Sequence, residues 1–139
     1  MTTQRQSPDA GFYRMRGAAY FENGDQDKAL ADYAEAILLN PDDCFAYSTR
    51  GYIYSVKGEY DRAIHEYDQA IRLSDAYINS EDGKEYSSEH GKEYGPLVVS
   101  RVYNNRGDAY VKKGEYDRAI ADCTASLRLD SDCAVAYET

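Results

Sequence analysis

The chain has 139 residues, 42% of them hydrophobic, and its 16 basic and 25 acidic residues give it a net charge of −9. This length suffices for one domain with a continuous core. The excess of acidic residues argues against binding to nucleic acid or to an anionic membrane surface, because both depend on clustered lysine and arginine. The sequence has no apolar run of 18 residues and its first residues are polar. We therefore expect neither a membrane span nor a signal peptide, and predict a cytoplasmic protein.

The first predicted element is a pair of helices over residues 10–43. Gly17 and Tyr20 lie on one face of the first helix, and Gly24 falls where that helix must end, because glycine tolerates the left-handed conformation that closes a helix. Asp27 begins the second helix, where free amide groups favour a carboxylate. The apolar stripe of the second helix consists of Ala29, Leu30, Tyr33, Ala36 and Ile37. We expect Gly17 to face Ala29, so that the two backbones approach closely.

The same pattern recurs twice further along the chain. The stretch Arg16–Tyr20 recurs as Arg50–Tyr54 and as Arg106–Tyr110, and the eight residues Lys57–Ile64 recur identically as Lys113–Ile120. The first two copies are 34 residues apart and the last two are 56 apart, so 22 extra residues separate them. Helix pairs of this length cannot bury their apolar faces alone, and they stack into a solenoid. The second and third predicted pairs cover residues 44–74 and 97–130.

The extra residues are placed by this alignment at residues 75–96. They carry six acids and two lysines, and three glycines interrupt them. We expect Asp75–Ile78 to lengthen the second helix of repeat two and the remainder to form an excursion between repeats two and three. Two interpretations stay open for this insertion. It is either an arm that contacts a partner, or a surface insertion that is tolerated because loop entropy grows slowly with length.

The last predicted element is a short helical stub over residues 131–139. The stretch Cys133–Tyr137 resembles Cys44–Tyr47 and would form the first turn of a fourth pair. We expect the third repeat to expose apolar edges unless the stub or another copy of the chain covers them. Those edges are at Ile120, Leu127 and Leu129. This expectation motivates the hypothesis that the chain self-associates through its C-terminal end.

The spacing of small, aromatic and acidic residues, together with Pro41 after the first pair, resembles the tetratricopeptide repeat family over most of the chain. The resemblance implies an all-α fold, a right-handed α-solenoid of three helix-turn-helix repeats plus the C-terminal helical stub. The departures are Tyr13, Tyr47 and Tyr103 for the family's tryptophan, and Arg16, Arg50 and Arg106 for its leucine. Cys123 and Ser126 lie on the core stripe of the third repeat at usually aromatic and alanine positions, and would make it pack less tightly.

The sequence contains no recognisable catalytic or metal-binding pattern. The potential ligands of the insertion have no regular spacing, and neither Cys-x-x-Cys nor His-Glu-x-x-His occurs. These potential ligands are Glu85, Glu89, His90 and Glu93. His65 is expected to face outward from its helix, and the odd number of cysteines favours reduced thiols over a disulfide framework. We therefore expect no enzyme activity, no metal and no cofactor.

The family resemblance assigns partner binding to a concave groove lined by the first helix of each repeat. The residues predicted to line it are Arg14, Met15, Phe21, Phe45, Thr49, Tyr52, Arg101, Asn104, Asn105 and Asp108. Amides can bond a peptide backbone, and aromatic rings offer rigid apolar surfaces. We predict a non-enzymatic interaction module that binds a peptide or helical segment of a partner protein. The alternatives are a self-assembling scaffold, a homo-oligomer formed through the C-terminal face, or an accessory subunit of an enzyme complex.

One branch of the family holds the C-terminal carboxylate of heat-shock chaperones. It uses a clamp of lysine, asparagine, asparagine, lysine and arginine at fixed positions of the groove. The corresponding residues in this chain are Arg14, Ala18, Thr49, Arg101 and Asn105. Two positive charges are kept, but both asparagines are replaced and the final arginine is an amide. The resemblance therefore argues against a chaperone carboxylate clamp.

Overall fold

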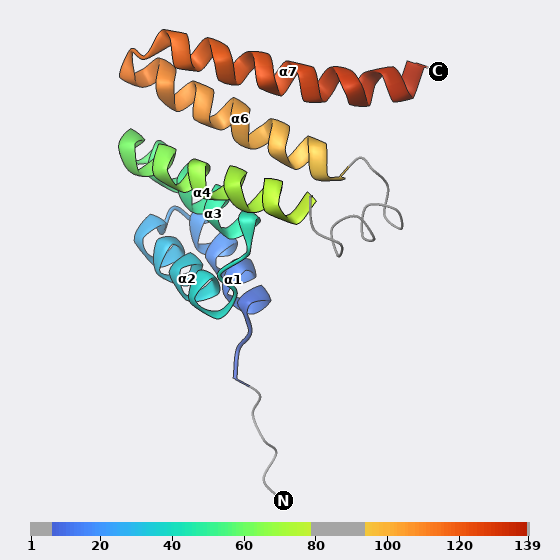
Figure 1. Cartoon of the computed structure of the whole chain (residues 1–139). Coiled ribbons are helices and arrows are strands. Elements are labelled where there is room, and N and C mark those ends of the chain that lie inside the picture. Colours follow the sequence, from blue (N-terminus) through green and yellow to red (C-terminus); the bar gives the residue numbers. More distant parts are fainter. Residues whose placement is uncertain (1–6, 79–93, 139) are drawn as a thin grey trace, which may run out of the picture.

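The computed structural model describes residues 7–78 and 94–138, and these residues form helices and no strands. The helices are α1 (Ala10–Glu22), α2 (Gln26–Leu39), α3 (Cys44–Val56), α4 (Tyr60–Ile78), α6 (Tyr94–Lys113) and α7 (Tyr116–Glu138). They form three antiparallel pairs, each with a first helix, called helix A (α1, α3, α6), and a second, called helix B (α2, α4, α7) (Figure 1). None of the described helices is long and apolar enough to cross a membrane.

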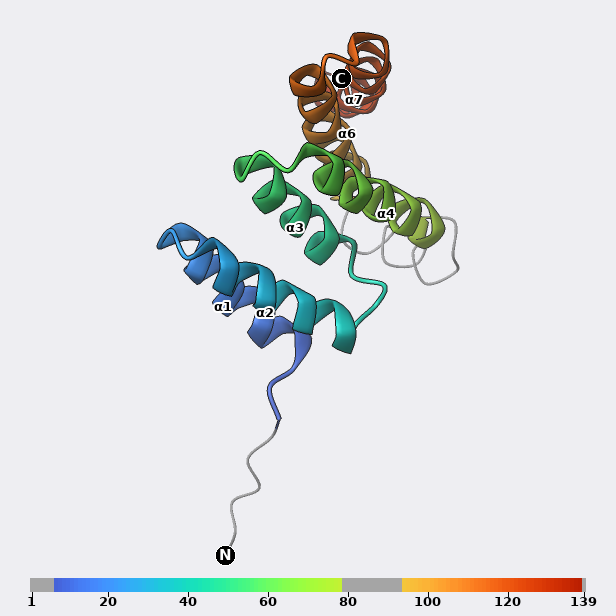
Figure 2. The ribbon, with the colours of Figure 1, turned by 90° about the vertical axis from the view of Figure 1, so that its left-hand side faces the viewer.

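The three pairs are stacked one upon the next. Helix α2 packs against α3, and α4 packs against α6, so helix B of each pair contacts helix A of the following pair. Figure 2 shows this order from α1 and α2 at one end of the stack to α6 and α7 at the other. The prediction of an all-α solenoid of helix pairs is confirmed.

Each helix A ends at the glycine that the sequence pattern predicts. Gly24 has a φ of +86°, its amide donates to the Phe21 carbonyl at 3.0 Å, and the next amide, of Asp25, donates to the Tyr20 carbonyl at 2.8 Å. These two bonds satisfy carbonyls that the end of a helix leaves open, and only a residue at positive φ can form them together. Equivalent turns occur at Gly58 (φ +83°) and Gly114 (φ +81°).

A second glycine in each helix A lets the pair close. A Cβ atom on Gly17 would lie 3.0 Å from the Tyr33 ring, and one on Gly51 would lie 2.8 Å from the Tyr67 ring. The close approach agrees with the prediction, but its partner differs from the expectation. Gly17 makes room for the aromatic ring of helix B, and Ala29 is not among its nearest neighbours. A large residue of one helix therefore fills the gap left by the smallest residue of the other.

The core lies at the joints between repeats. One cluster joins α2 to α3 and another joins α4 to α6. The first contains Ala29, Tyr33, Ala46 and Ile53. The second contains Ala63, Tyr67, Ala70, Ile71, Val102 and Ala109. Because each cluster draws on two repeats, the side of a helix B that faces away from its own helix A is buried by the next helix A.

Charged pairs brace each helix pair, and the sequence pattern did not reveal them. Arg106 donates two hydrogen bonds to the Asp122 carboxylate, at 2.8 and 2.7 Å, and a third to Asp68 at 2.8 Å. The same position of the first two repeats is occupied by Arg16, bonded to Asp32, and by Arg50, bonded to Glu66. Each guanidinium also lies over the tyrosine three residues earlier: Tyr13, Tyr47 or Tyr103. Arginine and tyrosine thus replace the family's leucine and tryptophan as a contacting pair.

The C-terminal stub is helical, as predicted, but it does not begin a separate helix. Residues 131–138 continue α7 without a break. Pro41 follows the end of α2, and proline cannot continue a helix. Asp75 and Ser131 occupy the matching positions of repeats two and three, so nothing ends α4 or α7 there.

The predicted extension of α4 is observed, since that helix reaches Ile78. The second part of the predicted insertion, residues 79–93, lies outside the described residues. Helix α6 begins at Tyr94, inside the predicted insertion.

The outer face of α7 is exposed. Ile120 and Leu127 are 64% and 67% exposed, as the sequence predicted, whereas Leu129 is half-buried. The core stripe was expected to include Cys123, but this side chain is exposed, because none of the described helices covers α7 as α3 and α6 cover α2 and α4. His65 faces outward as predicted.

Candidate peptide-binding groove

Two hollows lie in a row between the A helices. The first, of about 500 Å³, lies between α1 and α3 and is lined by Gly11, Arg14, Met15, Tyr33, Phe45 and Thr49. The second, of about 320 Å³, lies between α3 and α6 and is lined by Phe45, Ser48, Thr49, Tyr52, Arg101 and Asn105. Phe45 and Thr49 of α3 form the wall between them. We call this pair of hollows the A-helix groove.

The two hollows occupy the same place in successive repeats. The positions of Gly11, Arg14 and Met15 in repeat one are occupied by Phe45, Ser48 and Thr49 in repeat two. In the same way, the positions of Phe45 and Thr49 are occupied by Arg101 and Asn105 in repeat three. The geometry of the groove therefore follows from the stacking of the repeats. Its chemistry does not repeat, because the residue types at these positions differ.

Asp43 fixes the start of α3 and ties it to α1. Its carboxylate accepts hydrogen bonds from the amides of Phe45 and Ala46 at 3.1 and 3.2 Å, which caps the helix. The same buried carboxylate lies 3.2 Å from a guanidinium nitrogen of Arg14. This one side chain thus holds both Phe45 and Arg14 in the first hollow.

The first hollow is mainly apolar. Met15 and Phe45 are 70% and 45% exposed, so their apolar surfaces are available to a ligand. The charge of Arg14 is balanced by Asp43. Burial raises the pKa of Tyr33, which keeps its phenol neutral, and the nearby Arg14 only partly opposes that effect. The hollow therefore suits an uncharged side chain.

The second hollow is also lined mainly by apolar surface, but it holds a positive charge as well. Arg101 is exposed and has no ion-pair partner among the described residues, and no acidic residue lines the hollow. The Asn105 amide offers donors and an acceptor beside it. Thr49 donates its hydroxyl hydrogen to the Phe45 carbonyl at 2.8 Å, so its oxygen can only accept a further hydrogen bond. These groups suit a carboxylate or an amide.

The structure brings together most of the residues predicted for the groove. Those that line the hollows are Arg14, Met15, Phe45, Thr49, Tyr52, Arg101 and Asn105. Phe21 lies beside them, with its ring centroid 5.8 Å from that of Tyr52. Asn104 and Asp108 are exposed but line neither hollow, and Asp108 pairs with Lys112 at 3.2 Å on its own helix.

The predicted groove set did not contain three of the lining residues, Gly11, Tyr33 and Ser48. The sequence pattern assigns Tyr33 only to the core, yet this residue also lines the first hollow. The helical stripe alone could not show this, because a stripe gives the face of one helix and not what the neighbouring helix leaves uncovered. The described residues contain no group of three side chains that could hold a metal ion, and the acidic and histidine side chains between Glu85 and Glu93 lie outside them.

The repeats match known protein families and structures. The tetratricopeptide repeat models match residues 10–43, 44–77 and 100–133. The mouse protein "Tetratricopeptide repeat protein 12" is 42% identical over 36 residues, which is 26% of this chain and only 5% of that protein.

Solved structures share most of the fold. The crystal structure of MamA matches with a TM-score of 0.71 at 25% identity. The match covers 91% of this chain and 61% of the MamA chain. A second match is the structure of the second TPR of Spaghetti (RPAP3) bound to the HSP90 peptide SRMEEVD, with a TM-score of 0.67 at 21% identity. This match covers 87% of this chain and 92% of the Spaghetti chain. With the family models matching three successive repeats, this chain belongs to the tetratricopeptide repeat family.

Proposed function

We propose that this chain binds an extended segment of a partner protein in the A-helix groove. The observation that supports this most is the repetition of one hollow in two successive repeats, with Phe45 and Thr49 shared between them. A groove with a repeated subsite suits a chain molecule whose side chains also repeat. The stacked helices hold the lining residues in place, which reduces the ordering cost of binding.

The spacing of the hollows favours an extended ligand. They lie on either side of α3, so their separation is about one helix spacing, roughly 10 Å. An extended peptide in the polyproline II conformation advances about 3.1 Å per residue with about three residues per turn, so side chains three residues apart face the same way and would reach both hollows. We expect an apolar side chain beside Met15 and Phe45 and a carboxylate or amide beside Arg101 and Asn105.

The HSP90 peptide is a natural comparison, because the TPR domains of Spaghetti are bound to it. This chain keeps Arg14 and Arg101, but Ala18 and Thr49 stand where the chaperone clamp has asparagine. Arg14 is also already paired with Asp43. We therefore expect the peptide SRMEEVD to bind no more tightly than a scrambled version of it.

A displayed library of random peptides tests the proposal, because it offers the groove many extended segments at once. Peptides selected on the wild-type chain are then titrated against the double variant Tyr52→Ala, Asn105→Ala. Both residues line the second hollow and neither is buried. We expect affinity to fall about tenfold or more, because removing a central aromatic side chain and an amide removes anchoring contacts.

Leu38→Ala is the matched control. Leu38 is 74% exposed on α2 and lines neither hollow, so its removal should leave affinity unchanged. Circular dichroism and thermal melting establish that all variants are folded. Equal affinity of the wild type and the double variant for every selected peptide would show that the groove is not the binding site.

A further inference from the structure

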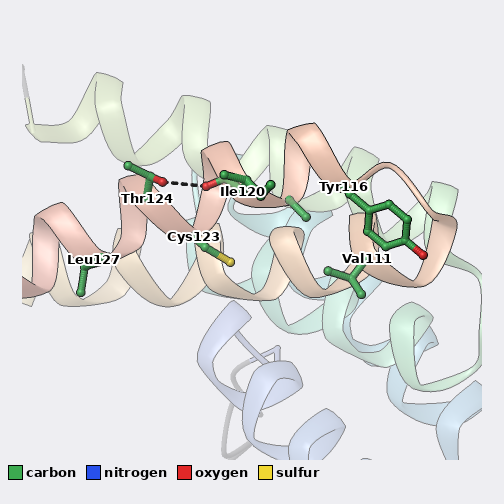
Figure 3. Close-up of a pocket in the computed structure, with 7 residues that line it drawn as sticks. Val111, Tyr116, Ile120, Cys123, Thr124 and Leu127 are labelled. Atoms are coloured by element: carbon green, nitrogen blue, oxygen red, sulfur yellow. Dashed lines mark hydrogen bonds between the residues drawn. The ribbon is translucent and has the colours of Figure 1, made fainter.

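The outer face of α7 forms a third hollow, of about 380 Å³, on a different side of the molecule from the A-helix groove. Figure 3 shows the side chains that surround it: Val111, Tyr116, Ile120, Cys123, Thr124 and Leu127. We call this surface the α7 face. Its lining is almost entirely apolar, and its large side chains are mostly more than half exposed.

The chain contains a covered version of the same face one repeat earlier. Ile71 of α4 corresponds to Leu127 and is 8% exposed, whereas Leu127 is 67% exposed. Tyr67 corresponds to Cys123 and is fully buried. The difference arises because α6 packs onto α4 with Val102 and Ala109 in the cluster, while no described helix packs onto α7 in this way.

The beginning of each helix B shows what kind of helix covers it. The identical stretches that begin α4 and α7 contain Tyr60 with Asp61 and Tyr116 with Asp117. In the covered copy, Lys113 at the end of α6 forms an ion pair with Asp61. Its neighbour Lys112 lies 5.9 Å from the centre of the Tyr60 ring.

The first joint of the stack follows the same rule for the carboxylate. Lys57, which follows α3, lies 2.7 Å from Asp27 at the start of α2. Helix α7 carries the corresponding Asp117, but no lysine or arginine pairs with it among the described residues. In repeat two, Tyr60 and Asp61 thus meet two consecutive lysines of α6. The corresponding residues of the α7 face, Tyr116 and Asp117, are both exposed.

We propose that the α7 face docks a helix of a partner protein that carries an apolar stripe and ends in two consecutive basic residues. The apolar stripe packs on Ile120 and Leu127, as α6 packs on α4. The first basic residue lies over the Tyr116 ring, and the second pairs with Asp117. The net charge of −9 further favours a basic partner at long range.

A second copy of this chain fits the α7 face less well. In a head-to-tail stack of two copies, α1 of one copy would pack on the α7 face of the other. At the end of α1, Glu22 and Asn23 occupy the positions that Lys112 and Lys113 occupy at the end of α6. Glutamate would place a negative charge over the electron-rich face of Tyr116, and asparagine cannot neutralise Asp117. Charge complementarity thus selects a basic-ended helix over a second copy.

The probe for this proposal is a synthetic peptide with the sequence of residues 97–114, which contains most of α6, the helix that covers α4. A side-chain cross-link on its outward face keeps it helical in solution, because a short isolated helix is only marginally stable. Fluorescence anisotropy of the labelled peptide measures binding to the full chain. We expect saturable binding that Leu127→Asp on the protein abolishes and that Leu38→Asp on α2 leaves unchanged.

Charge reversal tests whether the two basic residues at the end of the peptide determine its binding to the α7 face. A peptide with Lys112→Glu and Lys113→Glu should bind about tenfold more weakly, because each attraction becomes a repulsion. The protein variant Asp117→Lys should weaken binding of the original peptide and restore binding of the reversed one. Rescue of that kind requires the two side chains to meet and would not follow from a general loss of folding.

Three outcomes would overturn the proposal. They are no binding by the cross-linked peptide, equal binding of the original and reversed peptides, and binding unaffected by Leu127→Asp. Sedimentation velocity decides between a partner helix and a second copy of this chain as the occupant of the α7 face. A wild-type dimer that Leu127→Asp converts to a monomer would assign the α7 face to a second copy and reject the partner helix. Circular dichroism of each variant confirms that a loss of binding is not a loss of fold.

Discussion

The second and third helix pairs share the same eight residues across the turn into helix B and yet pack differently. In the second pair, a Cβ on Gly51 would lie 2.8 Å from the Tyr67 ring, and Tyr67 is fully buried. In the third pair, a Cβ on Gly107 would lie 3.5 Å from the Cys123 sulfur, and Cys123 is exposed. Identical turn residues therefore produce the same hairpin, while the neighbouring repeat decides what the hairpin buries.

The two pairs also distribute their charged contacts differently. Arg50 bonds one acid of its own pair, whereas Arg106 bonds Asp122 of its own pair and Asp68 of the pair before it. The third repeat is thus held to the second by charge as well as by apolar contacts. A repeat with a small residue at its core position depends more on such contacts than a repeat with tyrosine there.

The largest expected effect comes from removing this arginine. Arg106→Met leaves Asp122, which is 4% exposed, without its partner, and we expect a loss of about 2–3 kcal/mol of unfolding free energy. The partial exposure of Arg106 keeps the loss below that of a fully buried pair. Urea unfolding measures it.

Two further variants test the cause of that loss. Arg106→Met combined with Asp122→Leu should recover part of the stability, because no buried charge is then left unpaired. Arg16→Met should cost less than Arg106→Met, because the Arg16 side chain is 46% exposed and pairs with one acid, Asp32, within the described part of the chain. Equal losses for Arg16 and Arg106 would contradict the special dependence of the third repeat on its charges.

The next effect tests the close approach of the two helices. Gly51→Ala should destabilise the chain by about 1–3 kcal/mol, because its methyl group meets a buried ring and overpacks the joint. Gly107→Ala should be neutral or stabilising by up to about 1 kcal/mol, since its nearest neighbour is 3.3 Å away and alanine favours the helix. Thermal unfolding of the two variants side by side would reveal the difference, and a reversed order would refute it.

Thiol labelling extends the comparison to a smaller, local effect. Cys123 is exposed, while burial raises the pKa of Cys44 and reduces its reactive thiolate at neutral pH. We expect an alkylating reagent to modify Cys123 first, and the rate at Cys44 to rise at a higher pH than that of an unperturbed thiol. Peptide mapping by mass spectrometry separates the two sites. Faster labelling of Cys44 than of Cys123 at neutral pH would show that the third repeat is better covered than the structure indicates.

Much of this fold could be predicted because its signals are local and repeated. Gly24, Gly58 and Gly114 mark helix ends through backbone geometry alone, and the period of 34 residues defines the pairs. The continuation of α7 was missed because similarity between residues 133–137 and the start of α3 outweighed a simpler signal. That signal is the absence of a proline where Pro41 follows the end of α2.

The groove was only partly predictable. Its expected position on the A helices came from the family resemblance, but the pairing of Arg14 with Asp43 depends on two helices that only tertiary structure brings together. The same reason hid the bonds from Arg16 to Asp32 and from Arg106 to Asp122. A separation of 16 residues between arginine and acid, repeated three times, was the available clue. It has no meaning until the geometry of the hairpin is known.

The smallest effect expected concerns the ion pairs that join the repeats at their surface. Lys57→Gln and Lys113→Gln each remove one lysine from the start of the preceding helix B, at Asp27 and Asp61. Exposed pairs contribute little, and salt screens what they contribute. We expect small losses of stability at low salt that vanish at high salt. A loss that persists at high salt would mean that the lysine stems, which lie only partly exposed, act by packing between repeats rather than by charge.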